Sequence, residues 1–463
     1  MSIENEPAAE QVRQAPSEDA QFIVGVIAAA GDHDGPALRR ALANLDPADI
    51  ADVIEHVPLE TARTIAKMVG RYLPPEFLAN LSWERREEIL PELPADYIGR
   101  ALGQLDTDDA ASVAADIDEQ QLGRVLAAAD EDTRLAVEEA LSFEEETAGR
   151  LMQREYVAAP EGDTVGDVID RMREDSAELP DEFFEIYIVD ALMRPIGAVR
   201  VSSLLRARRE TPLVDIMRSP LILIRPEMDQ EEMAQTFQKY HMASAPVVDE
   251  AGRIKGMVTV DDIVDVITEE SEEDLLKLAG VSEAAQTDSV FKSVRARAPW
   301  LLVNLGTAII ASWVISNFEG SINQLIALAV LMPIVASMGG NAGTQALAVA
   351  VRAIASRDLN ESNAPRYVLR EAMTAMSNGA IFAAVLGIVV SFWFPQTPLL
   401  AVAIALAILI NFACAGLAGI LVPLTLRRFG ADPAVSSSVF VTFVTDVVGF
   451  MAFLGLATVI LLS

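Results

Sequence analysis

The sequence has almost no cysteine or histidine. Among 463 residues there is one cysteine, Cys414, and there are three histidines, His33, His56 and His241. A single cysteine forms no intrachain disulfide, which fits a reducing compartment for the soluble part of the chain. The histidines are too scattered to predict a transition-metal cluster, and no glycine-rich loop for nucleotide hydrolysis is present. We therefore do not expect an enzyme.

Basic residues are also scarce, with 35 Lys and Arg against 68 Asp and Glu and a net charge of −33. Six acids and six bases fall between Pro299 and the C-terminus, so the whole excess of acid lies in residues 1–298. Such a surface repels nucleic acid and anionic lipid headgroups and attracts cations. The N-terminal stretch MSIENEPAAE has no apolar core, so we expect no cleavable signal peptide.

The C-terminal third contains long apolar stretches. Each is near or above the roughly 20 residues that a membrane-spanning helix needs. We predict five spans, at residues 300–317, 322–354, 373–394, 399–426 and 434–462.

Arginine marks only alternate ends of these spans. Arginines precede span one, surround the connection between spans two and three, and follow span four, whereas NFEGSIN and FPQTP carry no Lys or Arg. By the positive-inside rule the basic ends and the soluble part are cytoplasmic, and an odd number of spans leaves the C-terminus outside. This predicts a multi-pass protein of the plasma (inner) membrane.

Asp446 is the only charged residue between Ala434 and Ser463. A carboxylate at membrane depth costs about 2.5 to 3.5 kcal/mol unless it is compensated, most simply by a cation. Thr442 and Thr445 lie within one helical turn of it, and the alternative is that Asp446 only hydrogen-bonds to one of these hydroxyls as part of helix packing.

Span two contains the motif MPIVASMGGNAGTQ. We expect Pro333 to break or kink this helix, and Gly339, Gly340 and Gly343 to let another backbone approach closely. The neutral oxygens nearby belong to Asn341, Thr344 and Gln345. Irregular backbone at this depth indicates a water-filled path or burial in protein, and a plain packing kink is the alternative.

Two soluble regions precede the membrane part. Residues 36–145 repeat short amphipathic helices with Asp or Ser caps and Leu-Pro breaks, which predicts an all-α superhelical domain of the interaction-scaffold type. Residues 146–267 alternate short β-rich runs with helices, and the stretch ending APVVDEAGRIKGMVTVDDIVDVI resembles a CBS domain. The less regular stretch before it looks like its partner. Tandem CBS pairs generally sense a nucleotide or an ion.

The span-two motif, the sequence RRFGADPAVSSSVFVTFVTDVVGF and the order of the domains together resemble the MgtE family of magnesium channels. The resemblance implies a homodimer whose pore is lined by spans two and five, with Asp446 of each subunit at the central Mg²⁺ site. Two carboxylates around a hydrated dication suit Mg²⁺, which gives up its waters reluctantly. Glu319 in the external loop would collect cations at the mouth, or is simply solvated. Asp432 would cap span five.

Eight acids lie in the fourteen residues from Asp261 to Asp274. An acidic helical face is usually just solvated, but here it connects the CBS pair to the membrane part. The resemblance makes it a plug helix that regulatory Mg²⁺ locks in a closed state. The residues implied as regulatory ligands are Asp262, Asp265, Glu270, Glu273, Asp274, Asp432 and Asp96.

The predicted fold is thus multidomain, with an all-α N-domain, an α/β CBS pair, an acidic connecting helix and an all-α five-helix membrane domain. The boundaries are a disordered tail at 1–35, the N-domain at 36–145, CBS domains at 146–212 and 213–267, the plug helix at 268–298 and the pore domain at 299–463. We expect passive, magnesium-gated Mg²⁺ transport. A carrier of Co²⁺ or Mn²⁺ and a non-conducting membrane-anchored sensor remain alternatives.

Four positions depart from the pattern of the family. His241 and Met242 replace an acid and an aromatic residue, Arg100 replaces a second acid after Asp96, and MRSP at 217–220 replaces Asn-Pro. These changes argue against a nucleotide site of the family's kind in the CBS pair, and predict fewer or rearranged regulatory sites.

Overall fold

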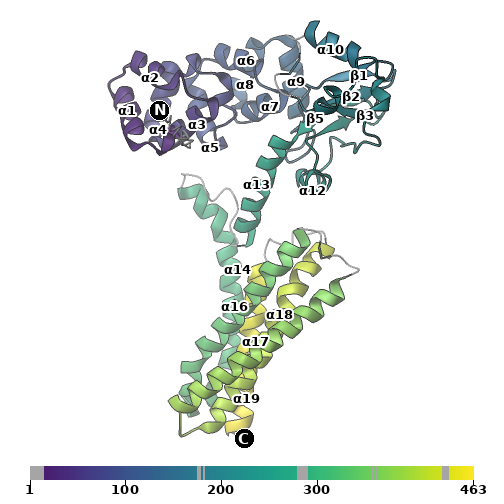
Figure 1. The fold of residues 1–463 in the computed structure, drawn as a ribbon. Helices are drawn as coiled ribbons and strands as arrows, with labels where there is room; N and C mark the ends of the chain where they lie inside the picture. The colour runs from purple at the N-terminus through teal and green to yellow at the C-terminus, as the bar shows by residue number, and fades with distance from the viewer. Residues whose placement is uncertain are drawn as a thin grey trace, which may run out of the picture. The chain divides into compact units, whose positions relative to one another are not determined.

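The computed structural model describes residues 15–174, 179–180, 183–278, 290–355, 358–359, 363–429 and 437–462. The chain divides into two compact units, one ending at Ile267 and the other beginning at Thr268. The first unit holds short helices followed by a mixed α/β region, and the second holds long helices (Figure 1). Each unit is described by itself below.

The first unit begins with nine short helices. Their bounds are α1 Ala20–Gly31, α2 Gly35–Leu42, α3 Pro47–His56, α4 Leu59–Val69, α5 Trp83–Ile89, α6 Ala95–Leu102, α7 Thr107–Ala115, α8 Glu119–Ala128 and α9 Glu131–Leu141. Aspartates at 34, 46, 118 and 130 cap α2, α3, α8 and α9 by accepting backbone N–H groups. Apolar residues from α1 to α9 form one continuous core. The predicted all-α domain of capped helices is confirmed.

The predicted disordered tail at 1–35 is wrong over its second half. Residues 20–31 form α1, which Asp19 caps by accepting the N–H groups of Gln21 and Phe22. Val26 and Ala30 of this helix are buried in the domain core. The apolar run FIVGVIAAA supplies the face that this packing buries, and burying it offsets the entropy of ordering the segment. Residues 1–14 lie outside the described part.

The α/β region has the expected tandem organisation. The first half contains β1 Ala158–Pro160, α10 Val165–Glu174, β2 Glu185–Val189, β3 Pro195–Arg200 and α11 Val201–Leu204, and the second contains α12 Gln230–Tyr240, β4 Ser244–Val248 and β5 Ile254–Thr259. Strand β2 pairs in parallel with β1 and antiparallel with β3, and β4 pairs antiparallel with β5. The buried Tyr187 hydroxyl of β2 donates a hydrogen bond to Ser244 Oγ of β4 at 2.8 Å and so links the first half of this region to the second.

The acidic segment is helical, as its row of acids predicted. Helix α13, Val260–Leu278, follows directly from strand β5 and runs across the predicted domain boundary at residue 268. Ile263 and Val266 on its first turns are buried in the core of the second CBS half, which is why the helix begins within that domain. Residues 279–289 lie outside the described part, and residues 290–298 belong to the next helix.

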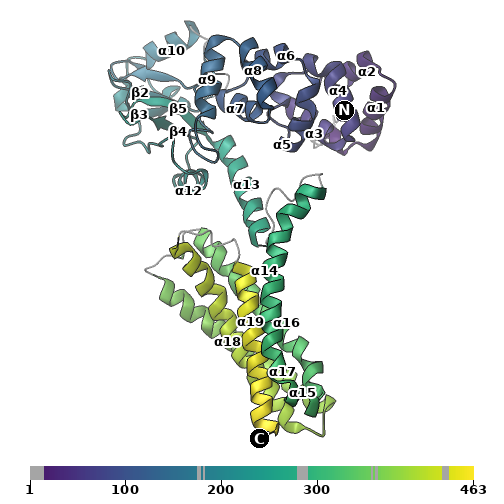
Figure 2. The same cartoon turned by 180° about the vertical axis from the view of Figure 1, so that it is seen from behind.

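The second unit contains all five predicted spans as helices that are long and apolar enough to cross a membrane. They are α14 Val290–Ser316, α16 Ala327–Ala355, α17 Ala364–Trp393, α18 Pro398–Arg428 and α19 Ser437–Ala457, the last extended by a π turn at Thr458–Leu462. Figure 2 shows these helices from the opposite side. The expected start of span two at residue 322 is wrong, because residues 319–324 form a separate short helix, α15 Glu319–Gln324.

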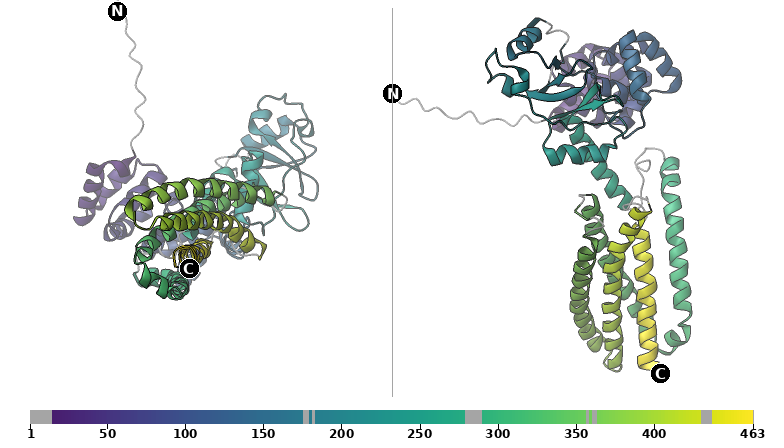
Figure 3. Two further views of the ribbon diagram at one scale, coloured as in Figure 1. Left: turned by 90° about the horizontal axis from the view of Figure 1, so that it is seen from below. Right: turned by 90° about the vertical axis from the view of Figure 1, so that its right-hand side faces the viewer.

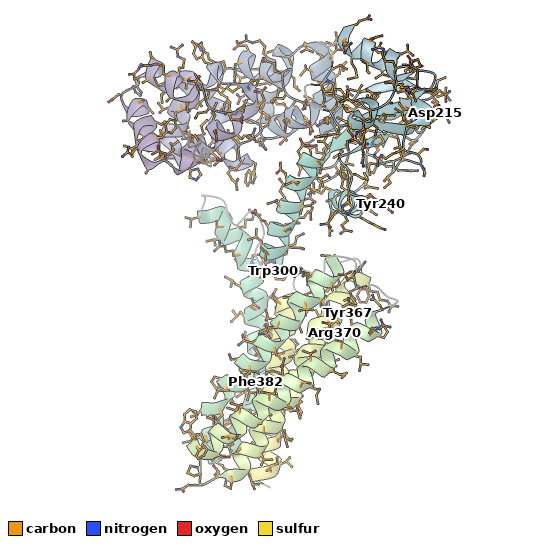
Figure 4. The ribbon with its side chains drawn as sticks, viewed as in Figure 1. Asp215, Tyr240, Trp300, Tyr367, Arg370 and Phe382 are labelled. Carbon is orange, nitrogen blue, oxygen red and sulfur yellow. The ribbon has the colours of Figure 1, made fainter. Side chains whose placement is uncertain are left out.

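Two local expectations for the spans also change. Pro333 lies inside a continuous α16, so it does not break the helix. Arginines 366 and 370, predicted in a connection, lie on the first turns of α17, where Figure 4 labels Arg370 beside Tyr367, with Phe382 further along the helix. The first turns of α17 are polar, so the apolar stretch that predicted this span covers only the rest of the helix.

Helix α18 is the centre of this unit. It packs against α16, α17 and α19, while α16 also packs against α19, and α14 contacts α19. Figure 3 shows the long helices standing side by side. A Cβ at Gly419 of α18 would lie 2.9 Å from the Gly343 carbonyl oxygen of α16, so the absence of a side chain allows this close approach.

Candidate functional site

The predicted pore helices α16 and α19 are antiparallel neighbours. A Cβ at Gly343 would lie 2.5 Å from Val441 Cγ1, and a Cβ at Gly449 would lie 3.4 Å from Val335 Cγ1. Moving toward the C-terminus of one helix therefore moves toward the N-terminus of the other. This register places Asp446 near the level of Gly339 to Asn341, in the middle of both helices.

Helix α19 has one face that is buried against its neighbours and another that carries Thr442 and Asp446. Thr445 is fully buried, and its hydroxyl donates to the Thr442 carbonyl oxygen at 2.9 Å. Thr442 is exposed and Asp446 is half-buried in the single chain. Within the described part of the chain the Asp446 carboxylate has no hydrogen bond or ion pair, so the threonines do not hold it as packing glue.

Helix α16 also divides its motif between two faces. Gly339 and Gly343 are buried against α18 and α19, while Asn341, Thr344 and Gln345 are exposed. A Cβ at Gly340 would meet no atom within 4 Å, and the Thr344 hydroxyl donates to the Gly340 carbonyl oxygen at 3.0 Å. The neutral oxygens predicted as pore-lining thus share one open face of the helix. The two glycines that face inward serve packing.

Asn411 is a buried polar residue of α18 that the sequence argument did not single out. It is 0% exposed, and its Nδ2 donates to the Val335 carbonyl oxygen at 2.9 Å. An asparagine in the middle of an apolar span is itself a signal of a functional position, because a polar side chain there is costly.

The sequence also predicted roles for Glu319 and Asp432. Glu319 is exposed at the start of α15 and forms no ion pair among the described residues. Asp432 lies outside the described residues.

The clearest cluster of acids in the first unit lies where the first turn of α7 meets the first turn of α13. Asp108 and Asp109 lie in the first turn of α7, and Asp261 and Asp262 lie in the first turn of α13. Asp108 is 7% exposed, and its Oδ1 has no hydrogen-bond partner among the described residues. Asp262 Oδ2 accepts a hydrogen bond from the Thr259 hydroxyl at 2.6 Å. Asp108 and Asp109 were not predicted, because their partner lies far away in the sequence.

The electrostatics of this cluster disfavour ionisation. Burial, and then the charge of Asp262, raises the pKa of Asp109 to about 6. The same two causes in the same order raise the pKa of Asp108 well above its usual value. Burial also raises the pKa of Asp262. The positive charge of Arg86 offsets this effect only in part for Asp109, and a cation placed among the three carboxylates would add to the compensation.

The other predicted regulatory acids are more exposed. Asp96 lies on the open face of α6 and pairs with Arg100 at 3.5 Å. Partial burial and then Asp261 raise the pKa of Asp265. Glu273 pairs with Lys277 at 2.7 Å on the second half of α13, where Glu270 and Asp274 also lie.

Among the described residues, no group of three acids, histidines or cysteines has the geometry of a closed metal centre. Mg²⁺ does not require one, because it keeps several waters and typically takes only one or two carboxylates from the protein. The Asp108, Asp109 and Asp262 cluster and the Asp446 position both offer donors of this kind.

Comparison with known proteins matches the N-domain, the CBS pair and most of the membrane part to family models. Residues 45–146 match the MgtE intracellular N domain, residues 148–210 and 213–269 match CBS domains, and residues 332–456 match the MgtE divalent cation transporter domain. The magnesium transporter MgtE of Thermus thermophilus is 31% identical over 440 residues, covering 92% of this chain and 96% of that protein. The magnesium transporter MgtE of Enterococcus faecalis is 34% identical over 322 residues, covering 70% and 71%.

A crystal structure titled as the cytosolic domain of the Mg²⁺ channel MgtE in complex with ATP is 32% identical, covering 53% of this chain and 99% of that one, with a TM-score of 0.49. The domain matches, the extent of the sequence matches and the five apolar helices agree with one another. The chain belongs to the MgtE family of magnesium transporters and is a multi-pass membrane protein.

Proposed function

We propose that this chain forms a homodimeric Mg²⁺ channel whose ion site is the pair of Asp446 carboxylates and whose gate is closed by cytosolic Mg²⁺. The observation that carries the pore assignment is the half-buried Asp446, without a partner among the described residues, at the level of the polar face of α16. Two such carboxylates facing each other supply a charge of −2 to a hydrated dication. Mg²⁺ would then move through the channel passively, driven by the membrane voltage and its own concentration gradient.

The open polar faces support the dimer. In the single chain Asn341, Thr344, Gln345 and Thr442 are exposed on helices that are otherwise apolar. Polar side chains at membrane depth rarely face lipid, because burying them in hydrocarbon is costly. They usually line a water-filled path or contact another helix. A second copy of the chain placed against these faces would give the polar side chains both a neighbouring helix and a water-filled path between the subunits. Neutral oxygens around the two carboxylates let the ion bind weakly enough to leave, as conduction requires.

The acids of the first unit support closure by cytosolic Mg²⁺. Asp108 and Asp109 interact with Asp262 of α13, and within the described part of the chain Asp108 Oδ1 has no hydrogen-bond partner. Mg²⁺ bound between them would offset their mutual repulsion and hold the N-domain to the start of α13. When the ion leaves, the carboxylates repel and the contact weakens, which frees α13. The acids at 265, 270, 273 and 274 would add ligands along the same helix.

The orientation follows from the basic residues. Arg352, Arg366, Arg370, Arg427 and Arg428 lie near the ends of α16, α17 and α18 that the positive-inside rule assigns to the cytoplasm. The soluble domains are then cytoplasmic, the C-terminus is outside, and the membrane is the plasma membrane.

Electrophysiology on the full chain in planar bilayers tests both parts of the proposal. Wild-type protein should conduct Mg²⁺, and millimolar Mg²⁺ on the cytosolic side should close it. Asp446→Ala should abolish conductance without loss of folding, whereas Asp262→Asn combined with Asp108→Asn should make the conductance insensitive to cytosolic Mg²⁺. Conductance retained by Asp446→Ala would refute the pore site. Equal conductance of Co²⁺ or Mn²⁺ would favour a general divalent carrier, and no conductance of any cation would favour a membrane-anchored sensor.

A further inference from the structure

The buried amide of Asn411 lies between the two proposed pore helices. A Cβ at Gly339 of α16 would lie 2.1 Å from Asn411 Nδ2, and a Cβ at Gly449 of α19 would lie 2.7 Å from the same atom. Both glycines therefore make room for one side chain. Gly339 precedes the open face of α16, and Gly449 lies one turn beyond Asp446. The amide thus lies at the depth of the proposed ion site.

The hydrogen bonding of Asn411 is incomplete. Its Nδ2 donates to the Val335 carbonyl oxygen at 2.9 Å, in the turn of α16 between Pro333 and Gly339. Its Oδ1 is buried and has no hydrogen-bond partner in the described part of the chain. The assignment of nitrogen and oxygen follows from chemistry, because a carbonyl oxygen accepts and cannot donate.

Stability alone does not explain an asparagine here. An aliphatic side chain with the same number of heavy atoms, such as leucine, would leave no buried acceptor unpaired. What the amide adds is a directional bond from α18 to the backbone of α16, at a point where α19 is in contact. A bond of this kind sets the spacing of two helices more narrowly than apolar contact does.

We propose that Asn411 is a positioning residue for the ion site, which holds α16 at a set distance from α19 at the depth of Asp446. It acts through the helices and does not contact the conducted ion. The inference rests on the proposed role of Asp446, since the spacing of α16 and α19 matters for transport only if that region conducts. Changing the amide should therefore alter the rate of Mg²⁺ uptake and the discrimination among cations while the fold persists.

The test uses the full chain in proteoliposomes and measures initial uptake of Mg²⁺ and of Co²⁺. Asn411→Leu should lower Mg²⁺ uptake about tenfold and change the Mg²⁺ to Co²⁺ ratio, with an unchanged elution volume and melting temperature. Gly455→Ala on α19 is the matched control, because its Cβ would meet no atom within 4 Å, and it should behave as wild type. A folded Asn411→Leu protein with wild-type rate and ratio overturns the proposal.

A double-mutant cycle tests the contact itself and serves if Asn411→Leu does not fold. Gly339→Ala alone should abolish uptake, because its new methyl group collides with the amide. Asn411→Ala should retain partial uptake, and Gly339→Ala with Asn411→Ala should match Asn411→Ala, since the collision is gone. Additive losses would overturn the proposal, and so would misfolding of both Asn411 variants, which would assign the residue to folding.

Asp446→Asn is measured alongside to separate the two proposals. If Asp446→Asn abolishes uptake and the Asn411 variants are neutral, only the positioning role fails. If Asp446→Asn conducts as wild type, the ion site itself is wrong, and the positioning role fails with it.

Discussion

Replacing Asp109 by asparagine should stabilise the contact between α7 and α13 when Mg²⁺ is absent. The pKa of this carboxyl rises from 3.8 to about 6 in the folded protein, because it is buried and lies near Asp262. A folded-state pKa above the unfolded value means that stability is fully present at low pH and is lost as the pH rises toward and through 6. At about 1.4 kcal/mol per pKa unit, the cost above pH 7 is roughly 3 kcal/mol.

Asparagine removes that cost but also gives up a charge at the first turn of α7, worth about 0.3 to 1 kcal/mol. The net gain for Asp109→Asn is therefore about 2 kcal/mol at pH 7.5, equivalent to roughly a 30-fold rise in hydrogen-exchange protection. The gain should shrink as the pH falls below 6 and approach zero below about pH 3, where the wild-type carboxyl is protonated in both the folded and the unfolded state.

Hydrogen exchange of the full chain in detergent, followed by mass spectrometry of the α7 and α13 peptides, measures this effect. The rates are corrected for the intrinsic pH dependence of amide exchange, and Mg²⁺ is first removed by chelation. Adding millimolar Mg²⁺ should protect these peptides in wild type and much less in Asp109→Asn. Asp132→Asn is the control, since Asp132 is an exposed acid in the first turn of α9. Equal protection of wild type and Asp109→Asn at pH 7.5 without Mg²⁺ would refute the reasoning.

The structure also predicts the behaviour of four other variants. Asp446→Ala should abolish Mg²⁺ uptake into magnesium-starved cells at normal expression, and growth at low Mg²⁺ supported by this variant would contradict the ion site. Gly343→Ala should lower uptake severalfold, because the added methyl group would lie 2.5 Å from Val441 Cγ1; wild-type flux would show that the helices are not in close contact there. Gly99→Ala should destabilise the N-domain by more than about 2 kcal/mol, because its Cβ would lie 2.6 Å from the Val125 backbone oxygen. The exposed Gly123→Ala should instead stabilise the same domain by about 0.5 to 1 kcal/mol, and thermal melting that ranks the two variants equally would contradict this packing.

Much of the architecture could be predicted because it depends on local patterns. Apolar runs of membrane-spanning length, the caps of the N-domain helices and the alternation of the CBS strands are properties of neighbouring residues. Asp446 could be selected for the same reason, since one charge in an apolar run is visible without knowing its surroundings. The comparisons confirm the family, and the role of each site residue stays a prediction.

Boundaries were predicted less well wherever packing decided them. Helix α1 forms because Val26 and Ala30 are buried in the N-domain core, and the domain boundary predicted at residue 268 falls inside α13 because Ile263 and Val266 are buried in the CBS core. Periodicity shows that such faces exist but not whether a partner surface is present. Helix α16 likewise continues through Pro333, where composition suggested a break.

By itself the sequence determined the order of the domains, the five spans and the single carboxylate in the last of them. Only the tertiary structure decided which distant surfaces meet. It joins Asp108 and Asp109 to Asp262, and it places the Asn411 amide against Gly339 and Gly449. The physical reason is that side-chain chemistry and helical period are local, whereas burial and the unmet charge or hydrogen bond that it creates depend on contacts between segments far apart in the chain.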